Sequence, residues 1–188
     1  MRRLIVSNLV SLDGFLAAPD GDLSWFEIGP EFLAYANGLM QQVDAILFGR
    51  VTYEMMRDYW TDPVGTHGND QTVVKQMNEL PKYVFSRTLK RAPWGKWDNA
   101  RVSADPVVTV TQLKAAGGGD MVIFGSGGLV STLAPRGFID EYRLIVNPAI
   151  LGQGTPMFRG LRERIGLKLV DSCRFDGDVV MLRYRPEN

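Results

Sequence analysis

Short apolar runs recur along the chain and alternate with segments whose apolar residues have helical spacing. Five runs are rich in Val, Ile, Leu and Phe, which is typical of buried strands, and they span 3–10, 44–48, 82–85, 121–124 and 142–146. A shorter strand is expected at 101–104. The segments predicted to be helical are 30–42, 53–60, 71–80, 110–116 and 129–134. This alternation predicts an α/β fold with a mostly parallel central sheet flanked by helices.

The end of the chain has a different pattern. Two β runs, 167–175 and 179–184, are joined across Asp176-Gly177-Asp178. Asp-Gly between two such runs is a strong signal for an antiparallel hairpin, which we place on one edge of the sheet. No internal repeat, linker or low-complexity segment interrupts the sequence. We therefore expect one domain over residues 1–188.

Glycine turns follow two of the predicted strands. The run 121–124 ends in Gly125-Ser126-Gly127-Gly128 and continues into a helix at Leu129. Glycines let the backbone approach a phosphate, and the free N–H groups at a helix start stabilise its charge. A purely structural tight turn explains the same glycines, and both interpretations stay open. Gly49-Arg50-Val51-Thr52 repeats the order of strand, glycine and helix.

A third polar cluster, Ser86-Arg87-Thr88, follows the strand at 82–85. If the strands are parallel, the three clusters lie along one edge of the sheet, a spread that suits a dinucleotide better than a single phosphate. The dinucleotide-binding pattern GxGxxG and the phosphate-binding pattern GxxxxGK[ST] are both absent. A site built from dispersed clusters is therefore predicted.

Composition narrows the range of partners. The chain is 45% hydrophobic and 22% charged, and its 21 basic and 21 acidic residues give a formal net charge of zero. This balance argues against binding to nucleic acid or to an anionic membrane. One cysteine, Cys173, and one histidine, His67, exclude a disulfide and a structural zinc site, so no metal is expected. No long apolar run occurs, and we expect a cytoplasmic protein.

Five segments in this order resemble the reductase domain of bacterial riboflavin biosynthesis enzymes, the RibD C-terminal domain family, and its stand-alone members. They read SLDGFLA, DAILFGRVTYE, YVFSRTL, VIFGSGGLVSTL and IDEYRLIVNPAILGQGTPMF. The resemblance implies the dihydrofolate reductase fold, NADPH as cofactor and a small-molecule substrate. It also implies a homodimer, for which 142–150 and the C-terminal hairpin would offer an apolar edge.

The resemblance assigns cofactor contacts residue by residue. Phosphate contacts are implied for Gly49, Arg50 and Thr52, and recognition of the adenosine 2′-phosphate for Ser86 and Arg87. The residues that match the pyrophosphate turn are Gly125, Ser126, Gly127, Gly128 and Leu129. Arg87 also suits this role chemically, because a guanidinium binds a phosphate monoester with two hydrogen bonds. Arg50 has an alternative partner in Glu54, four residues further along the helix.

Substrate contacts are predicted near the start of the chain. Asn8 and Trp25 are candidates to bind substrate, and Asp13 matches the acid of the family's S-x-D-G motif, where it would orient or protonate substrate. Asp13 is also a common turn former before Gly14. Glu31 lies at the helix start where dihydrofolate reductases carry their substrate-binding acid, although an acid there also complements the helix dipole. Arg159 follows a glycine-rich loop and could hold a substrate phosphate.

The predicted function is NADPH-dependent reduction of a pyrimidine-like or pterin-like molecule. The nearest named activity is reduction of 5-amino-6-(5-phosphoribosylamino)uracil. Two alternatives stay open, which are reduction of dihydrofolate and nucleotide binding without turnover.

Overall fold

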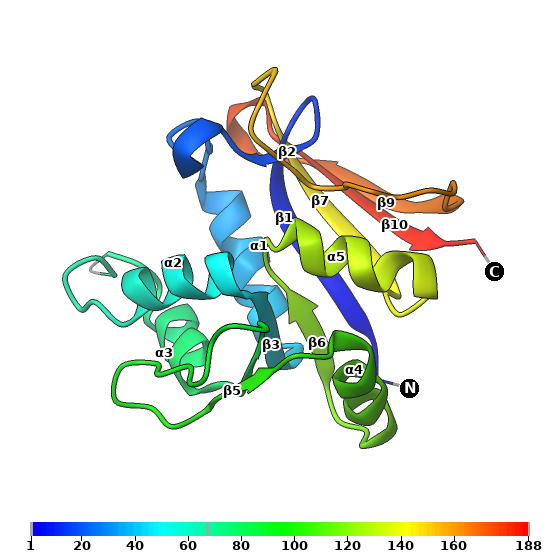
Figure 1. Ribbon diagram of the computed structural model, residues 1–188. Coiled ribbons are helices and arrows are strands. Elements are labelled where there is room, and N and C mark those ends of the chain that lie inside the picture. The colour runs from blue at the N-terminus through cyan, green and yellow to red at the C-terminus, as the bar shows by residue number, and fades with distance from the viewer. Residues whose placement is uncertain (1, 67, 188) are drawn as a thin grey trace.

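The computed structural model describes residues 2–66 and 68–187, so the prediction made for His67 lies outside the described residues. An eight-stranded sheet forms its centre, with the order β5-β4-β3-β6-β1-β7-β10-β9 (Figure 1). The strands are β1 (Leu4–Ser11), β3 (Val43–Gly49), β4 (Lys82–Phe85), β5 (Ala100–Ser103), β6 (Asp120–Ile123), β7 (Glu141–Asn147), β9 (Leu167–Arg174) and β10 (Val180–Pro186). In this order, all pairs of adjacent strands from β5 to β7 are parallel. Only β10 runs antiparallel to its two neighbours, β7 and β9. This confirms the predicted fold class and the C-terminal hairpin.

Helices cover both faces of the sheet (Figure 1). They are α1 (Pro30–Met40), α2 (Arg50–Trp60), α3 (Gln71–Glu79), α4 (Pro106–Ala115) and α5 (Gly127–Leu133). The first three pack on Ile5 and its neighbours, and the last two pack on Leu4 and Val6. Successive residues of β1 therefore enter opposite cores, as the two-residue period of a strand requires. Trp94 is fully buried and stacks on Phe48.

Three helices begin earlier than the sequence predicted, and α5 does so by two residues, at Gly127. α4 begins at Pro106 because the Asp105 carboxylate accepts hydrogen bonds from the N–H groups of Val107 and Val108, which caps the helix. α2 begins at Arg50, directly after the strand, so Arg50, Val51 and Thr52 form its first turn. The helical segment predicted from the sequence is 53–60, with Arg50 and Thr52 expected at its start. Their backbone N–H groups therefore belong to a helix start.

A small second sheet was not predicted. β2 (Phe15–Ala17) pairs with β8 (Thr155–Pro156) and fastens the glycine-rich loop after β7 onto the segment that follows β1. Gly154 permits this approach, since its φ is 141° and a Cβ there would lie 2.1 Å from the Ala17 carbonyl oxygen. The two strands are too short to give a periodic signal in the sequence.

The predicted dimer edge needs a correction. β7 lies between β1 and β10, so its backbone groups are paired within the sheet and 142–150 offers no free edge. The outer strand on this side is β9. Association into a homodimer itself stays a prediction. Within the described residues, no helix has the length and apolar character needed to cross a membrane.

Candidate functional site

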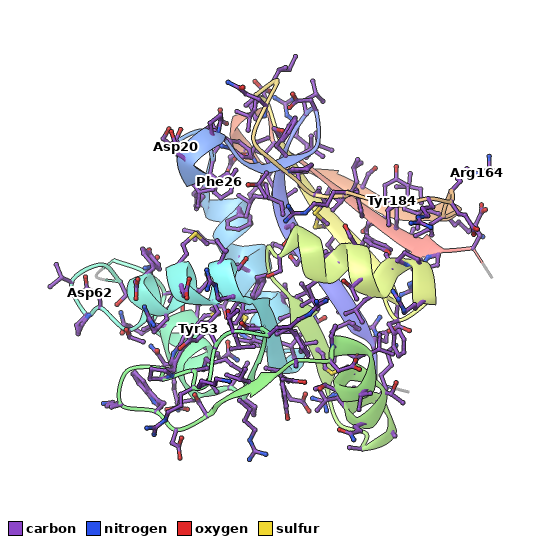
Figure 2. The ribbon with its side chains drawn as sticks, viewed as in Figure 1. Asp20, Phe26, Tyr53, Asp62, Arg164 and Tyr184 are labelled. Atoms are coloured by element: carbon purple, nitrogen blue, oxygen red, sulfur yellow. The ribbon has the colours of Figure 1, made fainter. Side chains whose placement is uncertain are left out.

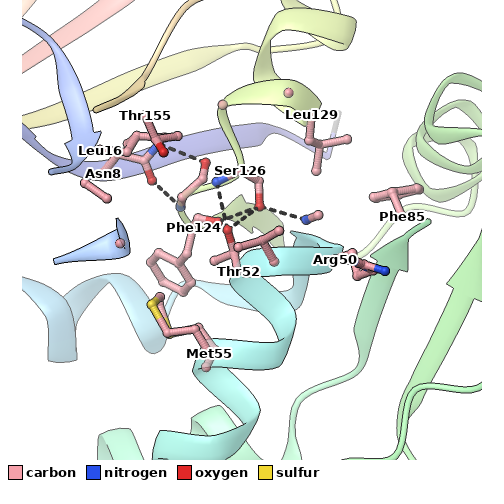
Figure 3. A pocket seen from close by; sticks show the side chains of 18 of the residues that line it. Asn8, Leu16, Arg50, Thr52, Met55, Phe85, Phe124, Ser126, Leu129 and Thr155 are labelled. Carbon is pink, nitrogen blue, oxygen red and sulfur yellow. Dashed lines mark hydrogen bonds between the residues drawn. The ribbon is translucent and has the colours of Figure 1, made fainter. Parts of the chain in front are cut away.

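A cavity of 740 Å³ opens at the carboxyl ends of β4, β3, β6 and β1 (Figure 3). Ligands of open α/β sheets usually bind at this edge. All ten residues predicted to contact the cofactor line the cavity: Gly49, Arg50, Thr52, Ser86, Arg87, Gly125, Ser126, Gly127, Gly128 and Leu129. Asn8 and Arg159 line it as well. The fold thus gathers five segments that are far apart in the sequence.

Hydroxyl groups fasten the two glycine turns to each other (Figure 3). The Ser126 N–H and the Ser126 hydroxyl both donate to Thr52 Oγ1, at 3.1 and 3.0 Å. The Ser126 Oγ in turn accepts a hydrogen bond from the Gly49 N–H at 2.7 Å. Ser126 has a φ of 58°, which costs a non-glycine residue energy, and these bonds hold it there. Both hydroxyls therefore bind the protein itself, and they set the distance between the starts of α2 and α5.

The Asn8 side chain also holds one of the glycine turns in place. Its side-chain oxygen accepts a hydrogen bond from the Gly125 N–H at 2.5 Å, and its amide nitrogen donates to the Gly125 carbonyl at 3.1 Å. Asn8 is only 2% exposed. The sequence predicted a substrate contact, but the amide is used to hold the Gly125 peptide, whose φ is 57°. Gly125 lies 117 residues from Asn8 in the sequence, so no local pattern predicts that Asn8 binds this peptide.

The cavity presents positive charge along the turns. The first N–H groups of α2 and α5 have no partner within their helices and lie at the positive ends of the helix dipoles. Arg50, Arg87 and Arg159 add three guanidinium groups. Arg50 also lies 3.8 Å from Glu54, as the alternative interpretation expected. None of the described residues that line the cavity is Asp, Glu, His, Cys, Lys or Tyr. This half of the cavity therefore suits an anion with several phosphate groups.

The cavity becomes apolar towards the end of β1. Its lining there includes Leu9, Leu23, Phe26, Met55 and Phe124. Phe26, labelled in Figure 2, comes from the segment before α1, and Met55 comes from α2. Sequence reasoning missed these side chains, because Phe26 lies in a turn-rich stretch and Met55 reads as an ordinary core position. The apolar end is suited to a flat organic ring.

Three predicted substrate residues lie outside the cavity lining. Asp13 is exposed, and its carboxylate accepts hydrogen bonds from the Ser11 hydroxyl at 2.7 Å and from the N–H groups of Leu151 and Gly152 at 3.1 and 2.7 Å. These bonds, the Ser11 bond foremost, lower the pKa of Asp13, which makes it a poor proton donor at neutral pH. Asp13 therefore joins the loops that follow β1 and β7.

Glu31 lies in α1 and Trp25 in the segment before it, and neither lines the cavity. Glu31 is exposed in the first turn of α1 and does not reach the cavity lining. The Trp25 indole donates to the Asp22 carbonyl at 3.2 Å and packs edge-on against the Phe26 ring, with centroids 4.5 Å apart. Trp25 thus supports Phe26 from outside the cavity. Across the described residues, no three His, Cys, Asp or Glu side chains gather closely enough to hold a metal ion.

Comparison with known proteins matches residues 2–181 to the model of the RibD C-terminal domain family. The uncharacterized protein YyaP of Bacillus subtilis is 31% identical, over 97% of this chain and 94% of its own. A deaminase and 5-amino-6-(5-phosphoribosylamino)uracil reductase from Thermotoga maritima superposes with a TM-score of 0.71 at 16% identity. The match covers 99% of this chain and 57% of that enzyme.

A dihydrofolate reductase from Enterococcus faecalis, solved in complex with NADP(H) and RAB-propyl, superposes with a TM-score of 0.65 at 15% identity. The match covers 99% of this chain and 97% of that protein. Likenesses at such low identity show a shared fold. They bear out the dihydrofolate reductase-like architecture expected from the sequence.

Proposed function

Because the chain belongs to the RibD C-terminal domain family, we propose that it is an NADPH-dependent reductase of a pyrimidine-like or pterin-like small molecule. The nearest named activity is reduction of 5-amino-6-(5-phosphoribosylamino)uracil, which the name of the Thermotoga maritima enzyme includes. One observation carries the proposal. A single cavity runs from Arg87, past two joined glycine turns, to an apolar end.

The residues present fit NADPH. Along the sheet edge, Ser86 and Arg87 follow β4, the glycine turns follow β3 and β6, and the apolar end lies beside β1. This order matches a phosphate monoester, a pyrophosphate and a flat ring taken in turn. A volume of 740 Å³ falls within the usual range of ligand pockets, about 300 to 1,000 Å³. The Enterococcus faecalis relative in fold was solved with NADP(H).

NADPH would supply a hydride to the substrate when both are bound. The chain's own residues hold the phosphates with cationic and N–H groups and exclude water with Phe26, Met55 and Phe124. Reduction of dihydrofolate is less well supported, because the candidate acid Glu31 does not line the cavity. Binding of NADPH without its oxidation by any pyrimidine or pterin would favour the alternative of a nucleotide-binding module.

Substitution of Arg87 by Ala tests the cofactor assignment. A lost charge-assisted bond to the 2′-phosphate costs about 1.5 to 3 kcal/mol, so NADPH affinity should fall about ten- to hundredfold. Affinity for NADH, which has no 2′-phosphate, should stay almost unchanged. Fluorescence titration of both cofactors measures this. Arg101→Ala is the matched control, since Arg101 is an exposed arginine of β5 outside the cavity lining.

Equal loss of affinity for both cofactors in Arg87→Ala would refute the assignment. The wild-type protein is then mixed with NADPH and either the phosphoribosylaminouracil or dihydrofolate, and NADPH absorbance is followed. Oxidation with the pyrimidine supports the riboflavin-type activity. Oxidation with dihydrofolate alone would replace it.

A further inference from the structure

An arginine at the rim of the cavity lies beside the glycine turn that follows β6. Arg159 is exposed, lines the cavity and belongs to the segment after β8. A Cβ built on Gly128 would lie 3.8 Å from the Arg159 Nη2. The guanidinium therefore lies within contact distance of the turn. The apolar lining of the cavity comes from other segments, at Leu9 and Phe26 among others.

The segment that carries Arg159 is fastened across this turn. The carbonyl oxygens of Pro156 and Met157 lie 2.6 and 3.0 Å from the position that a Cβ on Gly127 would take. The Arg159 N–H donates to the Ser131 hydroxyl of α5 at 3.1 Å. The backbone of Arg159 is thus held against α5. Its side chain starts from a fixed point beside the turn, which lowers the entropy cost of a contact with a ligand there.

The Arg159 guanidinium is not engaged by the protein itself. Among the described residues, no carboxylate lies within 4.0 Å of it, whereas Arg50 has Glu54 at 3.8 Å. The hydrogen bond of Arg159 to Ser131 uses the backbone N–H and leaves the side chain free. A guanidinium carries five N–H donors and binds phosphate oxygens with charge-assisted hydrogen bonds. An anion held at the turn would meet these donors.

From this arrangement we infer that Arg159 is a cofactor-binding residue, whose guanidinium donates to the pyrophosphate held by the turn 125–128. The inference rests on the proposed function and adds a contact from the segment after β8, where the sequence had predicted a substrate phosphate. The pyrophosphate is common to NADPH and NADH, whereas the 2′-phosphate occurs in NADPH alone. Arg159 should therefore strengthen the binding of both cofactors alike, which distinguishes it from Arg87.

Substitution of Arg159 tests the inference through binding, without turnover. Arg159→Ala should lower the affinities for NADPH and NADH by the same factor, about tenfold, the value of one charge-assisted hydrogen bond. Arg159→Met, which keeps an apolar stem without the charge, should show the same loss, and Arg159→Lys should bind both cofactors more tightly than Arg159→Met. Arg162→Ala is the matched control, since Arg162 is an exposed arginine of the same loop outside the cavity lining. Fluorescence titration measures each affinity.

Salt separates a lost charge from a disturbed turn. Arg159 is exposed, so its attraction for the pyrophosphate is screened as the ionic strength rises. The ratio of wild-type affinity to Arg159→Ala affinity should therefore fall as NaCl is added. A turn that the substitution had disturbed would weaken binding by a similar factor at every salt concentration.

The inference is overturned by any of three results. These are unchanged affinities in Arg159→Ala, a loss confined to NADPH, which would assign Arg159 to the 2′-phosphate, and a loss that does not depend on salt. Titration of the wild type separates the two proposals. Wild-type binding of both cofactors that Arg159→Ala leaves unchanged refutes the role of Arg159 alone, whereas a wild type that binds neither cofactor refutes the proposed function.

Discussion

The two ends of the parallel strands use different chemistry. At their amino ends, charged groups are paired within the fold. Ion pairs join Arg2 to Asp44, Arg3 to Asp120, Lys114 to Asp140, and Glu141 to Arg143, Arg183 and Arg185. At the carboxyl ends, the neutral side chains of Asn8, Thr52 and Ser126 hold the turns.

This difference shows where charge is left for a ligand. The ion pairs at the amino ends neutralise the charge of their arginines. At the cavity, neutral hydrogen bonds shape the turns, and among the described residues Arg87 and Arg159 have no carboxylate within 4.0 Å. Their positive charge is therefore available to an anion. Variants at the two ends should separate stability from cofactor binding.

Glu141→Gln should have the largest effect, on stability. Glu141 is fully buried, and Arg143, Arg183 and Arg185 lie 2.8 to 2.9 Å from its carboxylate. Although burial opposes ionisation, the hydrogen bonds from Arg143 and Arg185 lower the pKa of Glu141. Removing one partner of a buried ion pair costs about 3 to 5 kcal/mol. Urea unfolding should show this loss.

The comparison also predicts what Glu141→Gln leaves intact. Glu141 lies at the amino end of β7, away from the glycine turns, so the folded variant should bind NADPH with wild-type affinity. Glu163→Gln is the matched control, since Glu163 is exposed and should tolerate the change. Unchanged stability in Glu141→Gln would show that the cluster is not a structural centre.

Local sequence patterns predicted the strands and the two glycine turns well, because strand, glycine and helix start are adjacent in the chain. Gly49 and Gly125 were found in this way. The apolar end of the cavity could not be predicted, because Ser7, Phe26 and Met55 come from separate elements and meet only in the fold. The roles of Ser126 and Asn8 depend on partners 77 and 117 residues away.

Glu31 illustrates the limit for a residue on a regular element. Its place at a helix start was predicted correctly, since α1 begins at Pro30. The direction of its side chain depends on how α1 rotates against the sheet, and no pattern within the helix fixes that rotation to one residue. The helix was therefore predicted correctly, whereas the substrate contact predicted for Glu31 did not follow from it.

Substitution of two adjacent glycines, Gly127 and Gly128, tests how closely the chain packs at the cavity. A Cβ on Gly127 would lie 2.6 Å from the Pro156 carbonyl oxygen and 3.0 Å from that of Met157. Backbone atoms cannot yield easily, so Gly127→Ala should cost about 1 to 3 kcal/mol and weaken NADPH binding by moving the start of α5. Chemical unfolding and NADPH titration measure the two losses.

Gly128→Ala is the matched comparison. A Cβ on Gly128 would meet only the Arg159 guanidinium, at 3.8 Å. Stability should change by less than about 0.5 kcal/mol. Similar destabilisation by both substitutions would mean that the turn, and not the approach of the β8 segment, sets the need for glycine.

Lys82, the first residue of β4, is the exception among the charged groups at the amino ends. It is fully buried and has no carboxylate partner among the described residues. Its ammonium donates to the carbonyl oxygens of Asn78 and Leu80, both at 2.7 Å, and lies 4.6 Å from the centre of the Trp94 ring. Burial lowers the pKa of Lys82 from 10.5 to about 7. The folded protein therefore releases this proton more easily than the unfolded chain does.

The final prediction is the pH dependence that Lys82 creates, which builds up gradually along the pH scale. Between pH 7 and pH 10 the unfolded chain keeps a proton that the folded state has lost, so the free energy of unfolding should rise with pH. The slope reaches at most about 1.4 kcal/mol per pH unit, and it vanishes below pH 7 where both states are protonated. Lys82→Met should remove this slope, whereas Lys168→Met, at an exposed lysine of β9, should keep it. Urea unfolding at pH 7, 8 and 9 measures the difference between wild type and each variant. If the free energy of unfolding has the same pH dependence in the wild type and in Lys82→Met, the two carbonyls and the Trp94 ring stabilise the ammonium enough to offset its burial. The amino ends of the strands would then tolerate a charge without a carboxylate partner at no cost in stability.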